Sequence, residues 1–313
     1  MEQRNRISRY TLAPSCAMAV LVLLAGCSLS PLARRTSAFA TAATATAKDT
    51  TNAYALVEQA HHDAEIAAMV ANFDKDGFHP ETIEPFMPAK DMEARTRVLE
   101  GLSRYAETLA YVSGDAPMND VDMQTTALGK SLEDLSKSGA VASFTKSAGV
   151  SNVDLNLATT AIDALGRALI ERRRSRDLPA ILKEMKTPIP QICALLEADI
   201  GDPEKSGLRN QLKNDYEALK RKQIQFIRDN EATMSAADKR DAIEALPKIV
   251  SAEASGDKSL SATQTALKQM AATHTALVES VGAKEAPAFR TMLSELISDG
   301  QQLHGFYAQL PAQ

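Results

Sequence analysis

The sequence contains few aromatic residues and only three cysteines. Phe, Trp and Tyr together make up 4% of the 313 residues, and Trp is absent. Folds rich in β-strands depend on aromatic and β-branched side chains, whereas the abundant Ala, Leu, Glu and Lys favour helices. Hydrophobic residues reach 44% and charged residues 24%, which is enough apolar material for a folded body. The composition therefore favours an all-α protein.

An excess of basic residues is also missing. The formal net charge is −5, with 35 basic and 40 acidic residues. Binding to nucleic acid depends on a basic surface that neutralises phosphates. A mildly acidic chain gives no support for a nucleic-acid partner, and we expect none.

The first 26 residues have the organisation of a secretory signal peptide. Arg4, Arg6 and Arg9 precede a short apolar stretch over 16–25. Ten helical residues at ~1.5 Å each reach ~15 Å, about half of the hydrocarbon core of a bilayer. A membrane-spanning helix is therefore not expected here, and a cleaved signal is.

The motif Leu24-Ala25-Gly26-Cys27 resembles the lipobox of bacterial lipoproteins. The resemblance implies that the Cys27 thiol carries a diacylglycerol, that the chain is cut before Cys27, and that the new amino group is acylated, for example with palmitate. Ser28, where Asp would retain a lipoprotein in the inner membrane, implies by the same resemblance the periplasmic face of the outer membrane. The alternative is an ordinary signal peptide followed by an incidental cysteine.

The cysteine count predicts a mature chain without an internal disulfide. Cys16 is lost with the signal and Cys27 is lipidated, so Cys193 alone remains. Cys193 shares one helical face with Ile189 and Ile192. This pattern predicts a buried core thiol in preference to a reactive one.

Beyond the signal peptide, two further regions are predicted. Residues 27–47 combine the lipidated cysteine with a stretch of Ala, Thr and Ser of little periodicity, which we interpret as a flexible tether. About twenty such residues would reach roughly 25 Å as a flexible coil. Residues 48–313 form a helical body, and the loose stretch 139–151 is a candidate hinge.

Apolar stripes at helical spacing run through most of the body. They predict an antiparallel bundle of about eight long amphipathic helices, joined by short connections and long enough for an elongated shape. Helix ends are predicted at Gly77, Gly114, Gly201 and Gly282, and helix starts at Asp177, Pro203, Ser235, Ser261 and Glu285. Pro247 is predicted to kink the helix that contains it.

One helix carries a candidate metal site. Glu58, His62 and Glu65 project from the same helical face, and helical bundles do bind metals through inward Glu and His side chains. However, the apolar stripe runs through His61, which turns His62 toward water. A solvated face stabilised by ion pairs is the preferred interpretation, and no cofactor is expected.

Two basic clusters are candidates for binding lipid headgroups or an acidic partner. The alternative is a solvated helix surface, with Asp163–Arg167 and Glu217–Arg221 as ion pairs four residues apart. The residues of the two clusters are Arg172, Arg173, Arg174, Arg176, Lys220, Arg221 and Lys222.

Sequence motifs of the common enzyme classes give no basis for assigning a reaction. Two S-x-x-K matches, at Ser143 and Ser255, lack the partner motifs that the chemistry needs. Whether the chain is an enzyme stays open, with the balance toward a non-enzymatic protein. The sequence thus predicts a membrane-tethered envelope lipoprotein that acts as a scaffold or interaction module for an unidentified envelope protein. The alternative functions are a metal-binding helical bundle and a carrier of a hydrophobic ligand.

Overall fold

A computed structural model describes residues 30–77, 79–114, 121–137, 141, 152–171 and 177–308. Over these ranges the protein is all-α, as the composition predicts, and its only β-type pairing is an isolated bridge between Asp202 and Ser206. The elements are α2 (Pro31–Asp76), the 3₁₀ turn η2 (Pro80–Thr82), α3 (Ala89–Val112), α4 (Val121–Lys137), α6 (Asn152–Glu171), α7 (Leu178–Glu184), α8 (Pro188–Ile200), α9 (Leu208–Asn230), α10 (Ala236–Glu279) and α11 (Pro287–Tyr307).

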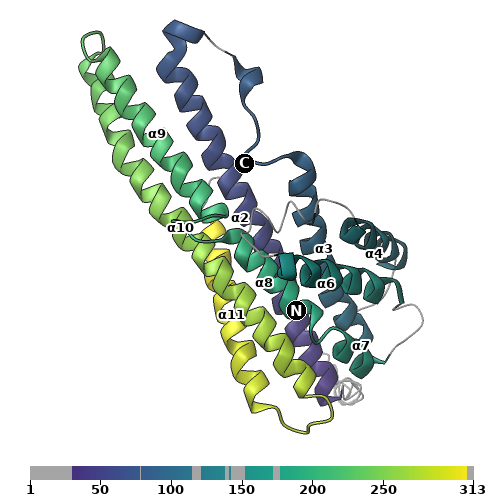
Figure 1. Ribbon diagram of the computed structural model, residues 1–313. Helices are drawn as coiled ribbons and strands as arrows, with labels where there is room; N and C mark the ends of the chain where they lie inside the picture. Colours follow the sequence, from purple (N-terminus) through teal and green to yellow (C-terminus); the bar gives the residue numbers. More distant parts are fainter. Residues whose placement is uncertain are drawn as a thin grey trace, which may run out of the picture.

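Helix α2 is the longest element and runs through the centre of the molecule (Figure 1). The Ser30 hydroxyl caps its first turn by accepting a hydrogen bond from the Ala33 amide at 3.1 Å. The helix ends at Gly77, as predicted, where a φ of 75° suits glycine. Its 46 residues correspond to a length of ~69 Å. Helices α3, α9, α10 and α11 all pack against it.

The prediction of a flexible tether is wrong for residues 31–47, which form the first third of α2. Phe39, Ala43 and Ala47 are buried there, at 0–2% exposure. Thr46 is also fully buried, and its hydroxyl donates to the Ala42 carbonyl at 3.0 Å. Because a Thr hydroxyl bonded to the preceding turn needs no outside partner, a stretch rich in Ala and Thr can line a core without an obvious apolar stripe.

Helix α10 also differs from the prediction, because it is a single helix of 44 residues. Ser235 and Asp238 form the predicted capping box at its start. The helix continues through Pro247, and Ser261 lies inside it instead of opening a new helix. Ser261 matches only the local composition of an N-cap, and the packing of α10 on α8, α9, α11 and α2 stabilises the longer helix.

The remaining helices cover the other side of α2 (Figure 1). Helix α3 packs on α2, and the α4–α6 pair packs on α3. Helices α4 and α6 approach closely at Gly129 and Gly166, where a Cβ atom on either glycine would lie 2.7 Å from the carbonyl oxygen of the other. Only glycine permits this backbone contact.

The directions of the helices follow the prediction in part. The α9–α10 and α10–α11 pairs are antiparallel hairpins, and α2 is antiparallel to α10, with Phe39 beside His274. Helix α9, however, runs in the same direction as α2, since His61 and Asp215 meet in the middle of the two helices and residues 70–75 lie beside residues 226–230. The candidate hinge 139–151 lies outside the described residues, except for the buried Val141.

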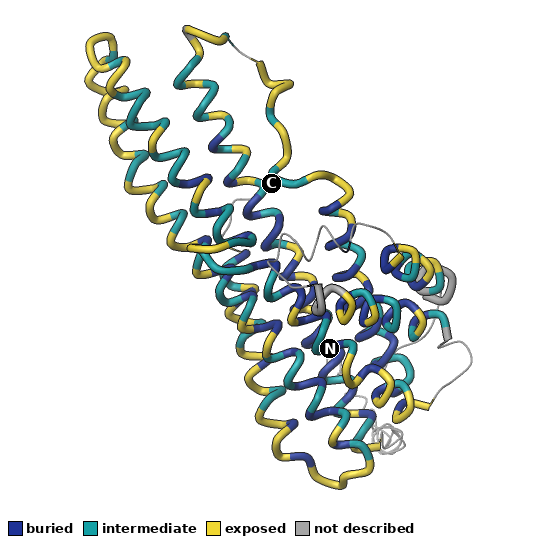
Figure 2. The backbone as a smooth tube through the Cα atoms, in the orientation of Figure 1, coloured by how far each residue is buried: buried dark blue, intermediate teal, exposed yellow. Residues whose placement is uncertain are grey.

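Burial divides the molecule into a base and an arm (Figure 2). We define the arm as residues 65–76 of α2 together with residues 217–255 of the α9–α10 hairpin, and the base as the rest of the described chain. Among the described side chains of the arm, none is buried. The whole buried core belongs to the base.

Candidate functional site

The sequence-predicted site residues fall partly outside the described chain. Cys27 and the basic residues Arg172, Arg173, Arg174 and Arg176 lie in stretches that the structure does not describe. Cys193 is described, and the prediction of a core thiol is confirmed. Its side chain is 1% exposed, and burial, with a smaller contribution from Glu197, raises the pKa of the thiol to about 12.

Glu58, His62 and Glu65 lie on α2 as predicted, with His62 exposed to solvent. Glu58 and His62 line a shallow groove between α2 and α3, beside Met92 and Thr96. Within the described residues, these side chains do not form a group of three or more potential metal ligands.

The base contains a buried ionic cluster that sequence reasoning missed. Arg95 on α3 binds Asp199 on α8 through two hydrogen bonds, from Nε at 2.7 Å and from Nη2 at 2.6 Å. The Tyr54 hydroxyl on α2 donates to the same carboxylate at 2.9 Å. All three side chains are about 2% exposed or less. The cluster therefore joins three helices inside the core.

Electrostatics in this cluster favour the charged pair. Burial alone would lower the pKa of Arg95, but the hydrogen bonds and negative charge of Asp199 outweigh it and raise that pKa. Burial, followed by the charge of Asp199, raises the pKa of Tyr54 well above its usual value. Tyr54 therefore stays a neutral donor, and the cluster has the character of a structural ion pair. The sequence signal for this cluster is a charged residue on the apolar face of a helix. Arg95 precedes Leu99 and Leu102 at helical spacing.

The loop between α8 and α9 lies next to this cluster. Gly201 and Gly207 at its two ends have φ values of 73° and 89°. A Cβ atom on Gly201 would collide with the Ser206 carbonyl, because the two ends of the loop cross closely. The predicted helix start at Pro203 is wrong, since α9 begins at Leu208 and the Asp202 side chain instead accepts a hydrogen bond from the Glu204 amide within the loop.

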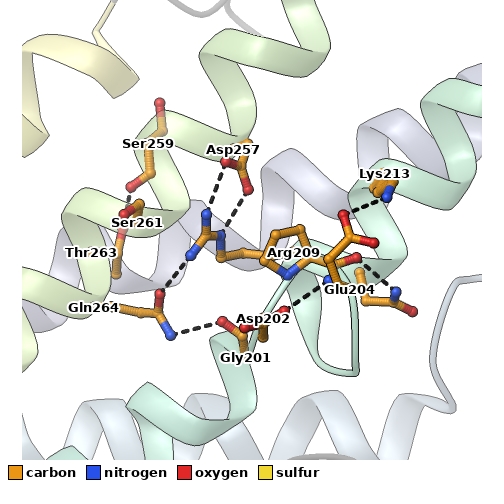
Figure 3. Close-up of polar contacts among 12 residues, drawn as sticks. Gly201, Asp202, Glu204, Arg209, Lys213, Asp257, Ser259, Ser261, Thr263 and Gln264 are labelled. Carbon is orange, nitrogen blue, oxygen red and sulfur yellow. Dashed lines mark hydrogen bonds and ion pairs between the residues drawn. The ribbon is translucent and has the colours of Figure 1, made fainter.

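A second polar cluster fastens this loop to α10 (Figure 3). Arg209 binds Asp257 through Nε at 2.7 Å and Nη2 at 2.9 Å, and Nη1 donates to Gln264 at 3.2 Å. Gln264 in turn donates to the carbonyls of Glu197 and Gly201. The three-way contact holds α8, α9 and α10 in fixed relative positions at the junction between the base and the arm.

Between these clusters, a pocket of about 400 Å³ opens at the start of α3. Arg95 and Asp199 form part of its wall, together with Phe86, Lys205 and Gln211. Arg95 and Asp199 already bind each other, Lys205 lies 3.9 Å from the Asp202 carboxylate, and the Gln211 amide donates to Asp215. The polar groups of this pocket therefore serve to join the helices that meet there.

The arm exposes most of the large apolar side chains that the described chain leaves uncovered. Ile66, Val70 and Phe73 follow one another at helical spacing on α2 and are 39%, 49% and 55% exposed. Ile243 and Val250, seven residues apart on α10, are 55% and 50% exposed. Apolar surface gathered in one region of a protein marks a site of interaction.

The basic residues Lys220, Arg221 and Lys222 belong to this arm. Arg221 lies 3.7 Å from Glu217, as the sequence predicts, and Lys222 lies 3.5 Å from the Gln225 side-chain oxygen. In the base, the other predicted pair, Asp163–Arg167, is also present at 2.9 Å. These contacts support the solvated-surface interpretation, while leaving the charge of α9 accessible.

Comparisons with known proteins give no relative for this chain: no family model, no curated protein and no solved structure matches it. Among the described residues, no helix has the length and apolar character needed to cross a membrane.

Proposed function

We propose that this protein is a non-enzymatic interaction module of the bacterial cell envelope, in which a stable helical base holds the arm out toward a protein partner. The observation that carries the proposal is the contrast between the two regions. The base buries the core, whereas the arm has no buried residue among its described side chains and exposes Ile243 and Val250. Such side chains gain burial only when another molecule covers them.

The location that we propose is the periplasmic face of the outer membrane, with acyl chains on Cys27 as the anchor. The support is the signal-like sequence over 1–26, the lipobox resemblance at Cys27, and Ser28 after it. Two or three acyl chains on one residue are enough for stable anchoring, whereas a single chain is marginal.

Crosslinking in intact cells tests the interaction. We expect epitope-tagged full-length protein to capture one envelope protein, and the Ile243→Ser variant to lose it. The matched control is Ile297→Ser, because Ile297 lies on the base and is 41% exposed. Equal capture by both variants, or no specific envelope protein captured by the wild type, would contradict the proposal.

Labelled palmitate tests the anchor separately. We expect the label to enter the wild-type protein and not the Cys27→Ser variant, which should leave the membrane fraction and remain folded. A labelled Cys27→Ser variant would show that the attachment residue is wrong.

A further inference from the structure

The first turns of α2 and the turn between α10 and α11 lie together at the end of the base that is farthest from the tip of the arm (Figure 1). Arg35 joins the two segments, because its guanidinium donates to three backbone carbonyls of the turn at 2.8–3.1 Å. These carbonyls lie at the C-terminus of α10, where a cation is favoured. We refer to the two segments, residues 30–36 and 279–288, as the end surface of the base.

The end surface is basic, although the protein as a whole is acidic. Arg34 on α2 and Lys284 on the turn both have exposed side chains. Lys186, between α7 and α8, lies 3.8 Å from Glu279 and offsets its charge. With Lys186 included, four basic and two acidic residues gather here, whereas the net charge of the whole chain is −5. The surface therefore attracts an anionic partner.

The exposed uncharged residues of the end surface are small or cyclic. They are Pro31, Gly282, Ala283, Pro287 and Ala288. Short side chains of this kind leave no bulky group standing between the basic residues and a flat partner. The end surface is therefore suited to lie against an extended anionic surface.

The position of the end surface indicates which anionic surface it meets. This inference rests on the proposed anchor at Cys27, which lies three residues before Ser30 and thus within ~11 Å of it along the chain. A bilayer that holds acyl chains on Cys27 is therefore close to the end surface. The other basic residues that the sequence singled out and the structure describes, Lys220 to Lys222, lie on the arm and have no such neighbour.

We propose that the end surface binds the phosphate headgroups of the bilayer that holds the anchor, and that this contact keeps the arm pointing away from the membrane. Arg34 and Lys284 bind headgroups from the two segments that Arg35 joins. Each basic residue close to an anionic membrane surface adds to the attraction. Contact at two joined segments resists tilting of the base, which attachment at a single point does not prevent.

Headgroup quenching tests the contact in the full-length lipidated protein, reconstituted into vesicles of phosphatidylethanolamine and phosphatidylglycerol. Cys193 is buried and Cys27 is acylated, so one added cysteine accepts a thiol-reactive fluorophore selectively. The fluorophore is attached to Ala283→Cys on the end surface or to Glu231→Cys at the tip of the arm. We expect a quencher on the lipid headgroups to quench the label at position 283 strongly and the label at position 231 hardly at all.

Charge reversal tests the role of the basic residues. In the Ala283→Cys protein, Arg34→Glu with Lys284→Glu should reduce the quenching at least about twofold, because the reversed charges are repelled by anionic headgroups. The matched control is Lys220→Glu with Lys222→Glu, an equal change of charge on the arm, which should leave the quenching unchanged. Both proteins should keep the helical circular dichroism of the wild type. An equal loss of quenching in the two proteins would overturn the assignment to Arg34 and Lys284.

Flotation of the same vesicles separates this inference from the proposed anchor. Vesicles that fail to carry the protein would contradict the anchor and overturn the inference with it. Vesicles that carry the protein while the label at position 283 stays unquenched would overturn the inference alone, since the end surface would then face something other than lipid. Equal quenching at positions 283 and 231 would show that the molecule lies along the bilayer, and would also overturn it.

Discussion

Two phenylalanines on the same helix show how the base and the arm differ. Phe39, near the start of α2, is fully buried, and its ring lies 5.5 Å from the ring of His274 on α10. Phe73, near the end of the same helix, is 55% exposed and lines a groove between the ends of α2 and α9. The residue type and the secondary structure are identical at the two positions. Only the number of helices packed around α2 decides whether an aromatic ring contributes to stability or stays available for binding.

The base and the arm should differ most in how much a substitution lowers the free energy of unfolding, and the largest decrease is expected in the ionic cluster of the base. Asp199→Ala removes the carboxylate that binds Arg95 and Tyr54, and leaves the Arg95 charge buried without this partner. Loss of one partner of a buried ion pair costs about 3–5 kcal/mol. We expect this decrease in the free energy of unfolding, measured by urea denaturation. The exposed arm variant Asp241→Ala should stay close to the wild type, and equal effects of the two changes would contradict the division.

The two phenylalanines give a matched test on one helix. Phe39→Ala should lower the free energy of unfolding by about 3–5 kcal/mol, because it leaves a cavity in the core. Phe73→Ala should change it by less than about 0.5 kcal/mol, because its ring is largely in water already. A small effect of Phe39→Ala would mean that the first third of α2 does not belong to the stable core.

A buried histidine makes the stability of the base depend on pH. Burial lowers the pKa of His274 to about 3, whereas an unfolded histidine titrates near 6.5. As the pH falls below 6.5, the unfolded chain takes up a proton that the folded protein does not accept. The free energy of unfolding should therefore decrease, by about 2 kcal/mol between pH 7 and pH 5.

Urea unfolding at the two pH values measures this dependence. The variant His274→Gln should lose this component of it, and His62→Gln, which changes an exposed histidine, should keep it. An unchanged pH dependence in His274→Gln would show that His274 is not the responsible group.

The smallest loss of stability among these predictions is expected for the helix cap at the tip of the arm. Ser235→Ala removes the capping box of α10 and should cost about 1 kcal/mol of local helix stability. Hydrogen exchange should accelerate at the amides of the first turns of α10, while the amides of the base stay protected. Faster exchange throughout the base would mean that the arm and the base unfold as one unit.

Much of the fold could be predicted from local signals. The helix end at Gly77, the capping boundary at Ser235 and the start of α7 after Asp177 depend on residues within a few positions of each other. Such signals survive folding because the groups involved satisfy each other. The all-α class followed from composition, because the abundant Ala, Leu, Glu and Lys favour helices.

The wrong predictions concern features that depend on contacts between residues far apart in the sequence. Residues 31–47 look like a tether because Ala and Thr give little apolar contrast, yet α10 and α11 pack against α2, and burial of Phe39 and Thr46 follows from the tertiary fold. Arg95 and Asp199 are 104 residues apart, so no local spacing connects them. The groove between the ends of α2 and α9 likewise depends on the parallel path of these two helices, which periodicity alone does not predict.

The continuity of α2 also sets a distance. Cys27 lies three residues before Ser30, a span of at most ~11 Å of chain. Phe73 lies 42 residues after Pro31 along the helix, which corresponds to ~63 Å. In the proposed lipid-anchored protein, the length of this one continuous helix therefore sets how far the arm extends from the bilayer. Removal of two helical turns from α2 would bring the exposed side chains of the arm ~11 Å nearer to the lipid, which would prevent contact with a partner held at a fixed depth in the periplasm.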